Sequence, residues 1–119
     1  MMMFIKFMDM VKEKDYYLEL TEDQYRFLEW FKDYTLLDTD ATDYEIADST
    51  VETFVKIDSE TNEMLFIRLM DSWEDIEYFL NLTEEQYNVL EWLKNNGMLD
   101  LETIDYEITD EREETFREI

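Results

Sequence analysis

The sequence predicts an α+β fold built from two tandem copies of one strand-strand-helix-strand-strand unit. Residues 1–57 align without a gap on residues 63–119, an offset of 62, and 27 of the 57 aligned pairs are identical. Each copy contains a segment with helix-start residues and apolar residues at helical spacing, and apolar residues alternate with polar ones on both sides of it. We therefore expect antiparallel sheet packed by two helices, with the copies related by a pseudo-twofold axis.

The chain has 119 residues, the length of one ordinary domain. We therefore expect repeat unit 1 at 1–57 and repeat unit 2 at 63–119 to share a core in one compact domain, with a turn or linker at 58–62. Hydrophobic residues make up 45% of the chain and aromatic residues 16%. Disordered chains are poor in aromatic residues, so the composition predicts a folded protein despite its high charge.

The strands are predicted from alternation and from apolar runs. FIKFMD at 4–9 returns as FIRLMD at 66–71, and the start MMMFIKFMDM is too short and too polar for a signal peptide or a membrane span. Period-two alternation at 17–20 and 43–46 predicts strands before and after the helix, and the segment 54–57 predicts a further strand.

Two points remain open in this strand assignment. The segments Asp9 to Asp15 and Asp71 to Glu77 could instead be short helices. Two apolar runs surround the polar sequence DSETNE between Phe54 and Leu69, which is typical of a hairpin with a longer loop. Such a hairpin would carry one sheet across the repeat boundary.

Each copy has a well-marked helix start. Thr21 and Thr83 are each followed three residues later by a glutamine, Gln24 and Gln86, which forms the pattern of a capping box. Each helix should run for about three to four turns. The second should end at Asn95-Asn96-Gly97, where the only glycine of the chain suits a left-handed cap.

The residue types exclude several kinds of chemistry. The chain has no His and no Cys, so a histidine base, a thiol nucleophile, a disulfide and a thiolate metal site are excluded. One glycine cannot form a glycine-rich phosphate loop. The repeated aromatic residues of the helix segments indicate packing rather than a ligand cage; they are Tyr25, Trp30, Tyr87 and Trp92. We expect no enzyme, no catalytic residue and no cofactor.

Carboxylate metal binding is the remaining chemical candidate. Asp38, Asp40 and Thr42 alternate like the oxygen ligands of calcium, but an EF-hand loop needs a glycine at its sixth position and an acid at its twelfth. Those positions hold Asp43 and Ser49, and the second copy at 100–105 loses another ligand. We therefore expect no dedicated metal site.

The acidity is the strongest functional indication. Ten basic against thirty-three acidic residues give a net charge of −23. A compact domain of this length is about 35 Å across, and duplex DNA of that length carries about twenty phosphates. Acids two apart on a strand, such as Asp43 and Glu45, are separated by about 6.6 to 6.8 Å, or about two axial steps of one DNA strand. Solubility alone needs only moderate charge, and this surplus causes self-repulsion, so we expect a basic partner.

In size, charge and lack of cysteine the chain resembles the small acidic proteins that phages use against bacterial defence, including Ocr-like DNA mimics and anti-CRISPR proteins. The stretches LTEDQYRFLEW and LTEEQYNVLEW are also similar to small phage open reading frames. The resemblance implies a phage-type inhibitor in the cytoplasm of an infected bacterial host. It would bind the basic nucleic-acid groove of a CRISPR effector nuclease or restriction enzyme and exclude target DNA.

We expect ten acids to act as phosphate surrogates toward this partner, without direct binding to nucleic acid or membrane. They are Asp38, Asp40, Asp43, Glu45 and Asp48 in the first copy, and Asp100, Glu102, Asp105, Glu107 and Asp110 in the second. The alternative is an acidic adaptor that binds a basic protein through a hydrophobic patch. Salt distinguishes the two, because many ion pairs weaken steeply as salt rises whereas an apolar anchor does not.

Overall fold

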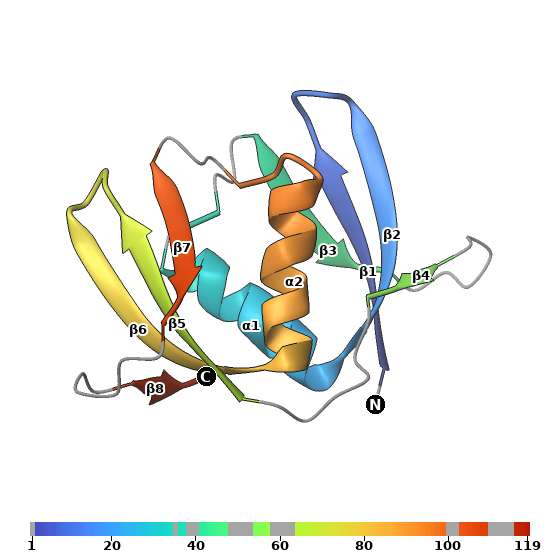
Figure 1. The fold of residues 1–119 in the computed structure, drawn as a ribbon. Coiled ribbons are helices and arrows are strands. Elements are labelled where there is room, and N and C mark those ends of the chain that lie inside the picture. Colours follow the sequence, from blue (N-terminus) through green and yellow to red (C-terminus); the bar gives the residue numbers. More distant parts are fainter. Residues whose placement is uncertain are drawn as a thin grey trace. The chain divides into compact units, whose positions relative to one another are not determined.

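Each half of the chain folds into a strand-strand-helix-strand-strand unit (Figure 1). The computed structural model describes residues 2–34, 36–37, 41–47, 54–57, 64–99, 103–109 and 116–119. The chain divides into two compact units, Met1–Asp58 and Ser59–Ile119. The predicted α+β class and the predicted order of elements within each unit are confirmed. The shared core and the pseudo-twofold relation stay predictions.

The first unit contains one four-stranded sheet and one helix. Its elements are β1 (Met2–Asp9), β2 (Lys14–Thr21), α1 (Glu22–Asp33), β3 (Thr42–Ile46) and β4 (Val55–Lys56). The strand order is β3-β1-β2-β4, with β1 antiparallel to β2 and β3. The short β4 pairs with β2 in parallel, so the sheet is mixed.

The second unit repeats this arrangement. Its elements are β5 (Met64–Asp71), β6 (Ile76–Thr83), α2 (Glu84–Asn95), β7 (Ile104–Ile108) and β8 (Arg117–Glu118). The strand order is β7-β5-β6-β8. Ile5 pairs with Leu18 in the first unit and Ile67 with Leu80 in the second, so the register is copied with the 62-residue offset.

Three details of the predicted sheet are corrected. The sheets are not wholly antiparallel, because the last strand of each unit pairs in parallel with the second. The sheet predicted to cross the repeat boundary is wrong, since β4 and β5 belong to different sheets; its loop at 58–63 lies outside the described residues. The alternative short helices are also wrong. Residues 10–13 and 72–75 are the turns of β-hairpins, each ending on a left-handed residue, Glu13 or Asp75.

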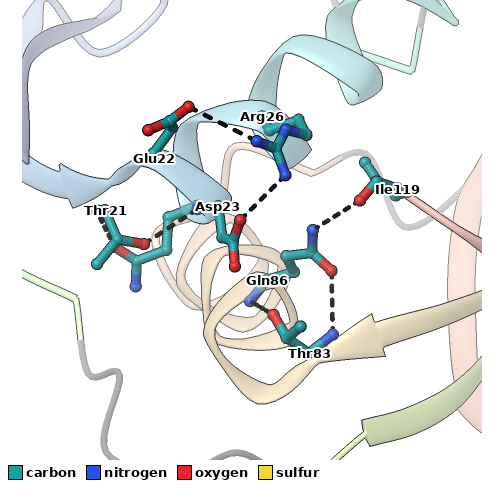
Figure 2. Close-up of polar contacts among 8 residues, drawn as sticks. Thr21, Glu22, Asp23, Arg26, Thr83, Gln86 and Ile119 are labelled. Atoms are coloured by element: carbon teal, nitrogen blue, oxygen red, sulfur yellow. Dashed lines mark hydrogen bonds and ion pairs between the residues drawn. The ribbon is translucent and has the colours of Figure 1, made fainter. Parts of the chain in front are cut away.

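Both predicted capping boxes are present. The Thr21 hydroxyl accepts from the Gln24 backbone N–H at 3.2 Å, and the Gln24 side-chain oxygen accepts from the Thr21 N–H at 2.8 Å. Thr83 and Gln86 form the same pair at 3.2 and 3.0 Å (Figure 2). These bonds satisfy N–H groups that a helix start leaves unpaired.

The capping glutamines also hold the last strand of each unit. The buried Gln24 side chain donates to the Ile57 carbonyl at 3.2 Å, and the Gln86 side chain donates to the backbone oxygen of Ile119 at 3.4 Å (Figure 2). In each unit, one glutamine side chain thus joins the start of the helix to the residue after the last strand, which is β4 in the first unit and β8 in the second. This contact fixes a strand only two residues long.

The core of each unit lies between the helix and one face of the sheet. Alternate residues of the first two strands face the helix, in the period-two pattern of a strand. In unit 1 these core side chains include Ile5, Phe7, Leu18, Leu20, Phe27, Leu28 and Phe31; in unit 2 they include Ile67, Leu69, Leu80, Leu82, Val89, Leu90 and Leu93. The opposite face, which we call the outer face, is not covered by the described helix of its own unit.

The end of α2 and the packing of Trp30 follow the sequence prediction. Each helix has 12 residues, and Gly97 takes a φ of 71° after the Asn96 C-cap of α2. Trp30 is half-buried and packs against Phe27 and Tyr34 with ring centroids 6.2 and 4.7 Å away. Trp30 therefore serves packing, as expected.

Candidate functional site

The described part of the chain contains four of the ten acids predicted to bind a partner. Asp43 and Glu45 lie on β3, and Asp105 and Glu107 lie on β7, which are edge strands of the two sheets. Their positions alternate with residues that face the helix, so each pair belongs to the outer face. The other six acids lie outside the described residues: Asp38, Asp40, Asp48, Asp100, Glu102 and Asp110.

These four carboxylates differ in how far they are neutralised. Asp43 lies 3.7 Å from the Lys32 ammonium, and Glu107 lies 3.1 Å from the Arg68 guanidinium. Neither Glu45 nor Asp105 forms an ion pair with another described residue. Mimicry of phosphates needs free charge, so Glu45 and Asp105 are the stronger candidates of the four.

Most cations of the described regions already have acidic neighbours. The Arg26 guanidinium contacts Glu22 at 3.6 Å and Asp23 at 3.0 Å (Figure 2). Arg68 bonds to Glu77 and Glu107, and these bonds hold the Arg68 pKa above its ordinary value. Lys6 pairs with Asp15 and Lys56 with Glu19, both at 3.8 Å. Since the whole chain has ten basic and thirty-three acidic residues, these pairs leave most of the negative charge without a cation to neutralise it.

A tyrosine–glutamate–tyrosine cluster fixes β3 to α1. The Tyr25 and Tyr44 hydroxyls donate to the two oxygens of Glu29 at 2.8 and 2.6 Å. The hydrogen bond from Tyr44, and to a smaller extent the one from Tyr25, lowers the pKa of Glu29, although partial burial of the carboxylate acts in the opposite direction. Burial and the Glu29 carboxylate raise the pKa of Tyr25 to about 12 and also raise that of Tyr44. The lowered pKa of Glu29 and the raised pKa values of the two phenols lie away from neutral pH, where a general acid or base works best. The contacts of the cluster fix β3 to α1.

The second unit repeats this cluster. Tyr87 and Tyr106 donate to Glu91 at 2.8 and 2.5 Å. Burial and Glu91 raise the pKa of Tyr87 to about 12. The edge strands β3 and β7 are thus held by equivalent contacts, and each presents its acids on a fixed backbone.

The outer face of each sheet carries three aromatic rings beside these acids. Phe54 packs edge-on against Phe4 and Tyr17, with centroids 4.9 and 5.8 Å away. Phe116 packs in the same way against Phe66 and Phe79, at 4.9 and 5.7 Å. Each cluster is half-buried and connects the residue before the last strand to the first two strands.

Sequence reasoning missed the ends of the first hairpin of each unit. Val11 and Trp73 occupy equivalent positions there and are 76% and 81% exposed. The signal was present in the alignment, because Trp73 is the one tryptophan without a tryptophan at its repeat-related position. An exposed tryptophan is unusual, since tryptophan is highly buried on average.

The described residues offer little metal-binding chemistry. In the segment considered and rejected as a calcium loop, Asp38 and Asp40 lie outside these residues, and the Asp43 carboxylate accepts from the Tyr44 N–H at 2.8 Å. In the ranges given above, no group of three acidic side chains is arranged to hold a metal ion. Neither helix of the described chain is long and apolar enough to cross a membrane.

No protein-family model, curated protein or solved structure matches the chain. A functional proposal must therefore be built on the charge and geometry of the two units.

Proposed function

We propose that this protein is an inhibitor that acts by occupancy, binding the basic nucleic-acid groove of a nuclease and excluding target DNA. The observation that carries the proposal is the net charge of −23 on a fold whose cations largely pair with their own acidic neighbours. A surplus that is not neutralised internally is best stabilised by a basic partner. The resemblance in size and charge to phage anti-defence proteins directs the proposal to CRISPR effector nucleases and restriction enzymes.

The duplicated edge strands support this proposal. Glu45 and Asp105 are the acids of β3 and β7 that form no ion pair with another described residue, and each strand is held to its helix by a tyrosine–glutamate–tyrosine cluster. A strand backbone that is already fixed loses little conformational entropy when its acids meet a lysine or arginine of the partner. Within each strand, the two acids are two residues apart, at a spacing of about 6.6 to 6.8 Å, or about two axial steps of one DNA strand.

The charge is unequal between the repeats. Residues 1–57 have six basic and fourteen acidic residues, a net charge of −8, whereas residues 63–119 have four basic and seventeen acidic residues, a net charge of −13. Long-range attraction to a basic groove should therefore depend more on the second repeat.

A competition experiment tests the proposal. Purified CRISPR effectors, free and guide-loaded, and restriction enzymes are incubated with labelled target duplex, and increasing amounts of the protein are added. We expect the protein to displace the duplex from at least one enzyme, to inhibit cleavage, and to lose affinity steeply as salt rises. Occupancy by charge would be contradicted if the protein inhibits an enzyme without displacing the duplex, or if it binds the enzyme equally well at high salt.

The second candidate is an acidic adaptor anchored by a hydrophobic patch. The exposure of Val11 and Trp73 favours it, because exposed apolar side chains at a turn suit a protein interface. An adaptor would retain its partner in high salt and in excess duplex. The two candidates share a basic protein as partner, and they differ in where the binding energy arises.

A further inference from the structure

Trp73 lies at the end of the β5–β6 hairpin with 81% of its surface exposed. Burial of one tryptophan in a partner removes about 150 to 250 Å² of its surface from water. Tryptophan is also among the residues most enriched at interface positions that carry large binding energy. The side chain is therefore the largest free source of apolar binding energy at this hairpin end.

The turn that carries Trp73 is held by hydrogen bonds. The Asp71 carboxylate is buried and accepts from the Trp73 and Glu74 N–H groups at 3.1 and 3.2 Å. The Ser72 N–H and hydroxyl both donate to the Thr103 carbonyl, at 2.8 and 3.0 Å. These bonds connect the turn to its own strand and to the segment before β7. A fixed backbone lowers the entropy that Trp73 loses on binding.

The surroundings of Trp73 are acidic. Residues 72–77 contain Glu74, Asp75 and Glu77 and no basic residue, a net charge of −3. The equivalent residues 10–15 contain two lysines and two acids, a net charge of zero. An apolar knob with an acidic rim is complementary to an apolar pocket rimmed by lysine or arginine.

We infer that Trp73 is the anchor of the complex, inserting into an apolar pocket on the basic face of the partner protein while the acids around it meet the basic rim. This inference rests on the proposed function, which supplies the basic partner. The charge steers the encounter and contributes ion pairs to the complex, so affinity still falls as salt rises, and Trp73 adds an apolar contact that slows dissociation.

The charge argues against other occupants of this site. Nucleic acid and anionic membrane surfaces would be repelled by the −3 of residues 72–77 and by the −13 of the second repeat. A second copy of the chain would bring the same negative charges together. A basic protein is the occupant that removes this repulsion.

The test compares Trp73→Ala and Trp73→Val with Val11→Ala, the matched change at the equivalent turn. Their affinities for the enzyme found by duplex competition are measured by biolayer interferometry at several salt concentrations. We expect both Trp73 variants to bind about 30-fold more weakly or worse, mainly through faster dissociation. Val11→Ala should change affinity less than about threefold. The salt dependence should remain, because the acids are untouched, and the exposed positions leave thermal stability unchanged.

A second measurement follows Trp73 directly. With 5-fluorotryptophan in place of the three tryptophans, the Trp73 fluorine resonance is identified by its loss in Trp73→Ala. Addition of the enzyme should shift or broaden this resonance and protect it from a soluble paramagnetic agent.

The outcomes separate the two proposals. Trp73 is not the anchor if Trp73→Ala binds the enzyme as tightly as the wild type in competition with duplex, and if the Trp73 fluorine resonance of the wild type stays accessible in the complex. Inhibition by charge would then still stand. Absence of binding to every enzyme tested would overturn the proposed function, and the anchor with it. Self-association that disappears in Trp73→Ala, detected by sedimentation velocity, would identify a second copy as the occupant and overturn the assignment to a basic protein.

Discussion

The two repeats have the same skeleton and different hairpin ends. Their registers, capping boxes and tyrosine–glutamate–tyrosine clusters match residue for residue across the 62-residue offset. At the hairpin end, Val11 and Lys12 of the first unit are replaced by Trp73 and Glu74 in the second. Contacts that hold the fold have been kept, whereas the exposed turn has changed in size and charge. This difference separates residues needed for folding from residues available for recognition.

The largest effect is expected at the shared skeleton. Gln24→Ala and Gln86→Ala should each lower the free energy of unfolding by about 2 to 4 kcal/mol, because each removes the acceptor of a part-buried N–H and the donor to a backbone oxygen after the last strand. Urea denaturation followed by circular dichroism measures the loss, and Thr83→Ser, which keeps the hydroxyl acceptor, is the control. Clearly unequal losses at Gln24 and Gln86 would mean that the two units are not equivalent in stability.

The turn aspartates should separate stability from recognition. Asp9→Ala and Asp71→Ala each remove an acceptor for two backbone N–H groups, so each should cost about 1 to 2 kcal/mol of stability. Only Asp71→Ala should also weaken binding to the basic partner, since it loosens the turn beneath Trp73. Asp71→Asn, which keeps a side-chain oxygen, serves as the control. Equal binding losses in the two alanine variants would show that the hairpin ends do not differ in function.

The tyrosine clusters should respond equally to mutation at neutral pH. Tyr44→Phe and Tyr106→Phe each remove one hydroxyl donor and should cost about 1 kcal/mol. For Tyr44 the loss should depend on pH. The folded-state pKa of Glu29 lies below its ordinary value. The stability that the ionised Glu29 gives to the fold is therefore fully present above the ordinary pKa, and it is lost as the pH falls through the folded-state pKa.

Urea denaturation of wild type and Tyr44→Phe at neutral and acidic pH tests this sign. The difference between the two proteins should shrink in acid. A difference that grows as Glu29 becomes protonated would contradict an ionised carboxylate held by Tyr44.

The smallest effects are expected for single surface acids. Glu45→Gln removes a free charge and Glu107→Gln removes one already paired with Arg68, so neither should change partner affinity more than about threefold. Titration calorimetry with the basic partner measures both, and a variant combining Glu45→Gln with Asp105→Asn should lose more than either single variant. One of these substitutions abolishing binding would indicate a local hot spot instead of distributed charge.

The parts of the fold that depend on local contacts were predictable from the sequence. Thr21 and Gln24 are three residues apart and satisfy each other, so the helix start was readable. The parallel pairing of β4 with β2 was not, because its partners Leu18 and Val55 are far apart in the chain and only two residues pair. The turn at 10–13 is not readable from the sequence, because its left-handed residue is Glu13 and glycine is the usual signal for that conformation.

The candidate site was predictable only in its charge. Asp43 and Glu107 were expected to be free, but Lys32 and Arg68 pair with them, and such pairing depends on neighbours that the sequence does not place. Trp73 was missed because an isolated apolar residue in a turn belongs to no periodic pattern. Comparison of the repeats at this position would have drawn attention to it.

The most direct test of inhibition by charge is the dissociation constant of the complex with the basic partner, measured as a function of salt and in competition with target duplex. The Debye length falls from about 30 Å at 0.01 M salt to about 8 Å at 0.15 M, so affinity carried by many ion pairs must fall steeply over this range. We predict this fall, together with complete displacement by duplex. A dissociation constant that is constant across this range and unaffected by duplex would contradict occupancy of a nucleic-acid groove.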